Sequence, residues 1–226
     1  MSFKQFTKEL SGNRIEGELV KAGFYSLVTS FIVIGLFYFT GILNSNLVGK
    51  YGQVLLVLAL SYAVILIAVR QIGSYGQMGC MSGMMVGMTI GMIAGFLPGY
   101  LIGMTNGMFI GSVFGMVVGI VFGALNGKCC GVMGIMEGIM AGFMGGLMGA
   151  MTAVMMINDN IKLAVIIVSI VSYVILILLN YMIYKEMKEN ERQRKEDHTI
   201  TVFLSIILIF IVTWFMVYGP RSSLFG

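Results

Sequence analysis

The chain has 226 residues, of which 58% are hydrophobic and only 11% are charged, and its formal net charge is +4. A soluble domain carries roughly 25% charged residues, so this composition excludes an ordinary soluble protein and predicts a membrane protein. The basic residues are neither clustered into a groove nor interleaved with aromatic side chains, so no nucleic-acid partner is expected.

Seven apolar runs are long enough to cross a hydrocarbon core of about 30 Å, which takes about 20 helical residues. The predicted spans are placed near 23–43, 53–70, 77–97, 100–126, 131–156, 161–184 and 199–218. The predicted fold class is therefore all-α: a polytopic integral membrane helix bundle of about seven transmembrane helices. Its first partner is the lipid bilayer, and the expected location is the cell membrane.

The orientation follows from the distribution of lysine and arginine. If the N-terminus is inside, eleven of the 14 basic residues face the inner side. Only Lys50, Lys162 and Arg221 face the outer side. Because basic residues concentrate on the cytoplasmic side of membrane proteins, the N-terminus is predicted inside and the C-terminus outside.

Composition divides the chain into four segments. Residues 1–22 form a polar N-terminal segment, and residues 23–70 hold two ordinary apolar spans. The central block, residues 71–157, contains 17 of the 21 methionines and 22 of the 31 glycines. Residues 158–226 hold two more spans, joined by a charged inner loop at 184–198.

Glycine recurs at every fourth residue of the central block from Gly79 to Gly131, and after a slip of one residue from Gly134 to Gly146. A single helix of the 53 residues up to Gly131 would be about 79 Å long, too long for one crossing. Breaks are predicted at Pro98–Gly99 and at 126–131. The ladder then fills two antiparallel helices, and its continuation a third. The alternative for the hairpin of 77–97 and 100–126 is a re-entrant pair.

Glycines four residues apart open a groove along a helix and let neighbouring backbones approach closely in lipid. The predicted packing residues are Gly83, Gly87, Gly91, Gly107, Gly111, Gly115, Gly138, Gly142 and Gly146. They would build a tight helix trio or a self-associating oligomer. The competing interpretation is a tolerated tandem repeat, because no single interface passes around a hairpin at Pro98.

Methionines repeat beside the glycines. The rows are Met84, Met88 and Met92, then Met104 and Met108, and in the third helix Met136, Met140 and Met144. Thioethers four residues apart share a helix face, and soft sulfur ligands select Cu(I). The alternative is a packing role alone, in which flexible methionines only fill the gaps beside a glycine groove.

The predicted topology brings Cys80, Cys129 and Cys130 together on the inner, reducing side as free thiols available to a metal. Glu137 is the only acidic residue of the central block and would balance charge or carry a proton. Alternatively, the adjacent cysteines are incidental to a turn, and Glu137 only snorkels to water. Asn106 is expected to hydrogen-bond between helices.

The combination of Met-x-x-x-Met with Gly-x-x-x-Gly, as at 84–88 and 104–108, is similar to motifs of the high-affinity copper transporters. The resemblance implies thioether steps in a membrane path, and it covers only a few turns. Those transporters have three spans where this chain has seven predicted spans, so the similarity is an analogy between motifs.

An enzyme is not expected, because the single histidine, His198, lies at a predicted helix boundary and no phosphate-binding loop is present. The functional prediction is transport of, or tolerance to, a soft metal cation such as Cu(I). The alternative is a glycine-zipper oligomeric channel or membrane assembly protein without a metal role.

Overall fold

The structure is a computed structural model that describes residues 15–39, 45–74, 79–156, 160–187 and 198–219. Within these ranges it contains seven α-helices, one short 3-10 helix and no strand. The helices are α2 (Ile15–Phe39), α3 (Ser45–Ser74), α4 (Cys80–Asn106), α5 (Met108–Gly127), α6 (Gly131–Met155), α7 (Ile161–Met187) and α8 (His198–Tyr218), with η1 (Lys128–Cys130) between α5 and α6. The predicted all-α helix bundle is confirmed.

Four helices of the described residues are long and apolar enough to cross a membrane by length and composition. They are α4, α5, α6 and the part of α7 from Leu163 to Lys185. The other three helices contain shorter apolar stretches at Gly23–Phe39, Ala59–Gly73 and Ser205–Met216. These lengths support a multi-pass membrane protein, with one helix for each predicted span.

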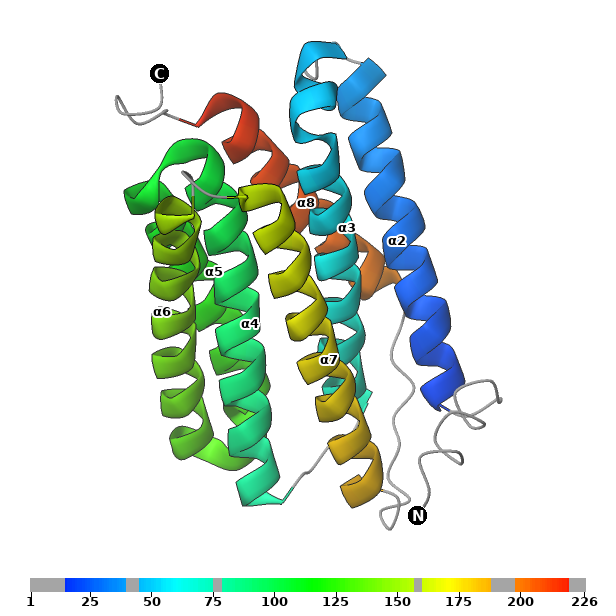
Figure 1. Ribbon diagram of the computed structural model, residues 1–226. Coiled ribbons are helices and arrows are strands. Elements are labelled where there is room, and N and C mark those ends of the chain that lie inside the picture. The colour runs from blue at the N-terminus through cyan, green and yellow to red at the C-terminus, as the bar shows by residue number, and fades with distance from the viewer. Residues whose placement is uncertain (1–14, 40–44, 75–78, 157–159, 188–197, 220–226) are drawn as a thin grey trace.

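Consecutive helices run in opposite directions, so α2, α4 and α6 begin at the end of the bundle where α3, α5 and α7 finish (Figure 1). This end carries Lys21, Arg70, Lys128 and Lys185, and we refer to it as the basic end. By the positive-inside rule it is the predicted cytoplasmic side.

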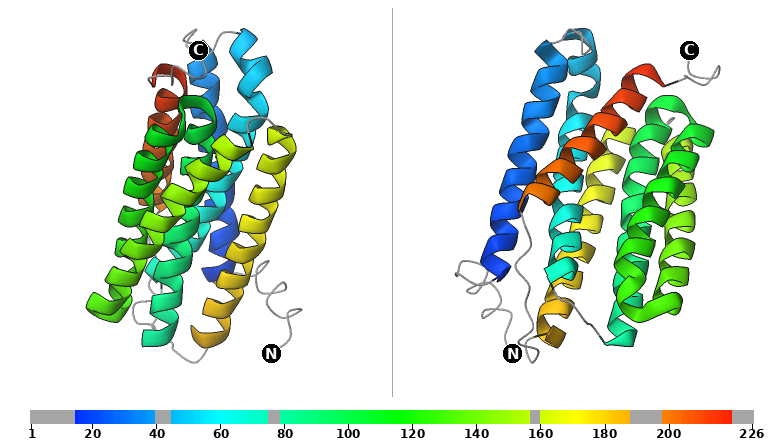
Figure 2. Two further views of the ribbon diagram at one scale, coloured as in Figure 1. Left: turned by 60° about the vertical axis from the view of Figure 1, so that its left-hand side comes forward. Right: turned by 180° about the vertical axis from the view of Figure 1, so that it is seen from behind.

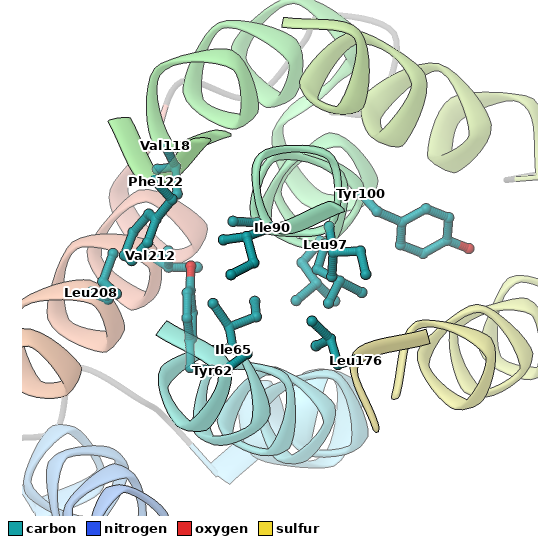
Figure 3. Close-up of a cluster of buried hydrophobic side chains, with 14 of the residues drawn as sticks. Tyr62, Ile65, Ile90, Leu97, Tyr100, Val118, Phe122, Leu176, Leu208 and Val212 are labelled. Atoms are coloured by element: carbon teal, nitrogen blue, oxygen red, sulfur yellow. The ribbon is translucent and has the colours of Figure 1, made fainter. Parts of the chain in front are cut away.

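Two groups of helices are visible in the views from several sides (Figure 2). The trio of α4, α5 and α6 stands on one side, and α2, α3 and α8 stand on the other, with α8 crossing obliquely. Helix α4 belongs to both groups. Its large apolar side chains, Ile90 and Leu97, point toward α3 (Figure 3). The core around them includes Tyr62 and Ile65 of α3, Leu176 of α7, and Leu208 and Val212 of α8.

The opposite side of α4 packs through glycines against α5. A Cβ atom placed on Gly119 would lie 2.8 Å from the Cα atom of Gly95, and one on Gly115 would lie 2.8 Å from the Cα atom of Gly99. The full antiparallel set is Gly87 with Gly127, Gly91 with Gly123, Gly95 with Gly119, Gly99 with Gly115, and Gly103 with Gly111. The two backbones are therefore in direct contact along the whole hairpin.

Helix α6 packs against both members of this hairpin. A Cβ atom on Gly91 would lie 2.8 Å from the carbonyl oxygen of Gly138, and one on Gly119 would lie 2.8 Å from that of Gly142. Helix α6 is thus parallel to α4 and antiparallel to α5. The glycine side of each helix therefore contacts both of the other helices. The predicted tight helix trio is present within a single chain.

The predicted break at Pro98–Gly99 is wrong. Helix α4 continues through Pro98, and the chain reverses at Gly107, whose φ of 97° and ψ of 168° are nearly restricted to glycine. The segment from Leu97 to Ile102 is buried. A turn at Pro98 would place these apolar side chains at a helix end, so their burial outweighs the one hydrogen bond that proline cannot donate.

The second predicted break, at 126–131, is confirmed. Helix α5 ends at Gly127, η1 follows, and Gly131 adopts a φ of 70°. This connection also explains the slip in the ladder, because Gly134 then lies opposite Gly127 and Gly138 opposite Gly123.

The turn between α4 and α5 lies at Gly107, which is itself a ladder glycine. A ladder that continues unbroken through this turn therefore places glycines of the two antiparallel helices opposite each other. Glycines equally far before and after Gly107 then lie opposite each other, from Gly103 and Gly111 to Gly87 and Gly127. One glycine interface therefore uses the ladder on both sides of the turn. The interpretation that no single interface could do so is wrong. The origin of the ladder as a tandem repeat stays a hypothesis.

We expect Gly119→Ala to lower the free energy of unfolding by about 1–3 kcal/mol, because its Cβ atom would meet only backbone atoms. Gly35→Ala in α2 is the matched control, since nothing lies within 4 Å of its Cβ position, and it should change stability by no more than about 1 kcal/mol in either direction. Thermal unfolding of the purified protein in detergent measures both. Equal losses would contradict the glycine packing.

We expect Gly107→Ala to destabilise the protein by about 1–3 kcal/mol, because alanine does not tolerate this backbone conformation. Pro98→Ala should leave the stability unchanged or raise it, because alanine restores a backbone donor inside α4. The same thermal assay compares the two variants. A larger loss of stability in Pro98→Ala than in Gly107→Ala would contradict a chain reversal at Gly107.

Candidate functional site

Two cysteines meet at the basic end of the trio. Cys80 is the first residue of α4, and Cys130 ends η1 and caps the N-terminus of α6. Their Cα atoms lie 4.9 Å apart, and their sulfurs form a disulfide. The glycine contacts make α4 and α6 parallel neighbours, so the first turns of both helices lie at the same end.

The predicted convergence of Cys80 and Cys130 is confirmed in position, but the prediction that both are free thiols is wrong for this structure. The sequence places both cysteines at one depth without setting the distance between them, and it indicates their redox state only through the predicted compartment. As a disulfide, neither sulfur is a thiolate that can bind a metal. The backbone of Cys129 lies in η1, and its side chain is outside the described residues.

Glu137 does not join the cysteine pair. It is half-buried in the second turn of α6, seven residues beyond Cys130, which corresponds to about 10 Å along the helix axis. Across the part of the chain that the structure describes, no three His, Cys, Asp or Glu side chains gather closely enough to hold a metal. Among the described side chains, Cys80, Cys130 and Glu137 therefore do not form one metal site.

The methionines of α6 form one continuous exposed stripe, with exposed fractions from 45% for Met151 to 68% for Met155. Its members are Met133, Met136, Met140, Met144, Met148, Met151 and Met155. From Met133 to Met155 the stripe rises by 22 residue steps, or about 33 Å of helix, with a net rotation of only about 40° between its first and last members. It begins beside Cys130 and is as long as a hydrocarbon core is thick. We call it the α6 methionine stripe.

The stripe lies on the outside of the trio because of its place in the sequence. Met136, Met140 and Met144 each follow a ladder glycine by two residues, which rotates them by about 200° from the glycine contacts. The interior of the trio is filled by backbone: a Cβ atom on Gly145 would meet the backbone of Met92. In the described trio, therefore, the methionines do not line an internal channel.

The other predicted methionines divide between the surface and partial burial. Met88 and Met108 are exposed, whereas Met84, Met92 and Met104 are half-buried. The exposed faces of α5 and α7 are made mainly of valine, leucine and isoleucine, including Val113, Val117, Val121, Leu163, Ile166 and Ile170. Methionine is thus concentrated on α6 and on the start of α4, where Met81 and Met85 are also exposed.

Polar contacts link neighbouring helices of the bundle. The Asn106 amide donates a hydrogen bond of 2.9 Å to the carbonyl of Phe215 in α8, and the Thr105 hydroxyl donates one of 2.6 Å to Asn106. The predicted interhelical role of Asn106 is confirmed. A contact that sequence reasoning missed links α3 and α7, where the Gln71 amide donates to the carbonyl of Asn180 at 3.2 Å. The Gln71 amide inside an apolar helix is its only sequence signal, because the acceptor is a backbone carbonyl.

No protein-family model matches the chain, and neither the curated proteins nor the solved structures contain a match.

We expect Cys80→Ser to lower the unfolding free energy of the oxidised protein by about 2–4 kcal/mol, because the disulfide closes a loop of about 50 residues. Cys129→Ser is the matched control and should keep the stability of the oxidised protein. Thermal unfolding with and without a reductant measures the effect. Equal loss in the two variants would show that the pairing is not between Cys80 and Cys130.

Proposed function

We propose that this membrane protein transports, or confers tolerance to, a soft metal cation, with Cu(I) as the first candidate. The reduced pair Cys80 and Cys130 takes the ion at the basic end, and the α6 methionine stripe carries it across the bilayer. One observation carries the proposal: a cysteine pair lies at one end of a thioether row that is as long as the hydrocarbon core of a membrane is thick.

The chemistry of the pair suits Cu(I), for which thiolate and thioether sulfur are preferred ligands. Reduction of the disulfide gives two thiols whose backbones are already adjacent. Both lie at helix N-termini, Cys80 on α4 and Cys130 on α6. The positive ends of the two helix dipoles favour negative thiolates there. Glu137, two turns along α6, then has the role of balancing charge at the next step.

The spacing of the α6 methionine stripe is suited to moving the proposed cation across the bilayer. Its members are three or four residues apart, so neighbouring Cβ atoms are about 5–6 Å from one another. Thioethers bind more weakly than thiolates because they are neutral, and a row of weak, repeated sites permits release as well as entry.

A cation on a lipid-exposed helix face is costly, so the stripe must be covered during transport. We infer that a second copy of this chain covers it, with the α6 helices of the two copies facing each other. Two facing stripes supply the two or three sulfurs of a Cu(I) site at every level. The proposed homo-oligomer therefore forms through the α6 methionine stripe. The paired ladder glycines do not contribute, because they are buried against helices of their own chain.

The alternative function is a membrane assembly protein in which the same α6 contact forms and no metal binds. One observation favours it: seven exposed methionines line one side of α6, and unbranched methionine adapts well to a helix contact. The two functions share the oligomer and differ in metal binding.

We expect the reduced protein to bind about one Cu(I) per chain at its thiol pair. Competition with a colorimetric chelator under nitrogen measures it. The double variant Cys80→Ser, Cys130→Ser should lose this binding, and the control Cys129→Ser should keep it. Replacing Met136, Met140 and Met144 with leucine should keep the binding and abolish transport, since Met-to-Leu swaps usually cost less than about 1.5 kcal/mol in packing. No binding above a detergent blank would overturn the metal function.

We expect Met144→Cys, in a background with serine at 80, 129 and 130, to give cross-linked dimers with a short bifunctional maleimide in membranes. A two-fold contact brings the same stripe of both copies together. Val117→Cys on the exposed face of α5 is the matched control and should stay monomeric. Equal cross-linking at both positions would contradict an α6 interface.

A further inference from the structure

The position of the Cys80–Cys130 disulfide conflicts with its predicted compartment. It lies at the basic end with Lys128, which the positive-inside rule places in the cytoplasm. Cytoplasmic thiols are kept reduced in most cells, and disulfides found there are usually transient, catalytic or redox-sensing. A pair placed close enough to bond that also faces a reducing solution is suited to change its redox state.

Two further features make the pair suited to exchange. Cys80 is exposed and Cys130 is half-buried, so small thiols and disulfides reach them from water. Each lies at the N-terminus of a long helix, where the thiolate, the reactive form, is favoured.

We propose that Cys80 and Cys130 form a reversible redox switch that closes the metal-accepting site when oxidised. The oxidant is a low-molecular-weight disulfide of the glutathione class. One cysteine thiolate attacks a sulfur of that disulfide, forms a mixed disulfide and releases one small thiolate. The other cysteine thiolate attacks the mixed disulfide and releases the second. Two electrons pass from the cysteines to the small disulfide, and two small thiols leave with the two cysteine protons.

The oxidised pair holds no thiolate, so it cannot accept Cu(I), and it ties the start of α4 to η1. The helix trio does not depend on this bond. The Gly87, Gly127 and Gly134 contacts begin within two turns of it and continue to the other end of the bundle. Reduction therefore frees two ligands without separating the helices. The effect on metal uptake rests on the proposed function, whereas the switch itself does not.

The test uses the full-length Cys129→Ser variant in lipid nanodiscs, which leaves one cysteine pair. The protein is equilibrated in buffers from fully reduced to fully oxidised glutathione, quenched with acid, and labelled with a polyethylene-glycol maleimide. We expect two labels per chain at the reduced end, none at the oxidised end, and recovery of both on returning. Labelling in every buffer, or in none, would overturn the switch.

Each form is then freed of glutathione by gel filtration under nitrogen and titrated with Cu(I) against a chelator. We expect the oxidised form to bind at least tenfold more weakly than the reduced form. Equal, measurable binding by both forms would overturn the switch as a control of the site. Reversible labelling with no binding by either form would instead overturn the proposed metal function and leave the redox pair standing.

Discussion

Direct contact between three glycine-rich backbones is the constraint on which the rest of this structure depends. Lipid supplies little hydrophobic force between helices, so the trio is held by dispersion between closely packed backbones. Such contacts tolerate no Cβ atom: one on Gly95 would lie 2.9 Å from the carbonyl oxygen of Gly142 and 3.1 Å from that of Gly115. The same register makes α4 and α6 parallel, joins Cys80 to Cys130 and turns the methionines of α6 outward.

Helix α4 connects this tight packing to a different kind of core. One side presents glycine to α5 and α6, and the other presents Ile90, Leu97 and Ile102 to ordinary apolar helices. Large side chains pack at larger separations than glycine, so the two sides impose different helix spacings. The burial of Leu97 and Ile102 keeps α4 continuous through Pro98. The Asn106 hydrogen bond to α8 then fixes its far end.

The helices and their membrane character could be predicted from the sequence, because apolar runs of span length have few other uses. The reversal at Gly107 could not, since proline is the stronger local signal and only the burial around Leu97 opposes it. The pairing of Gly87 with Gly127 follows from symmetry about Gly107 once that pivot is known. For the site, sequence indicated that Cys80 and Cys130 share a depth. The separation of Glu137 from Cys130 could be predicted too, because seven helical residues cover about 10 Å. The close approach of Cys80 to Cys130 could not, because the distance across the bundle depends on the register.

The close packing of the trio would let one cysteine pair serve two states, the disulfide and the proposed metal-bound form. Two sulfurs on opposite sides of a metal ion are about 4.6 Å apart when each metal–sulfur bond is about 2.3 Å. The Cα atoms of Cys80 and Cys130 are 4.9 Å apart, and glycine contacts that do not involve sulfur hold their helices in place. Under the proposed function, side-chain rotation at a fixed backbone would be enough to carry the sulfurs between the disulfide and a metal-bridged arrangement. Little chain would then have to be ordered on binding of the proposed ion, which strengthens binding for a given set of ligands. A site on flexible loops would lack this advantage, and the glycine ladder provides it at the end where the methionine stripe begins.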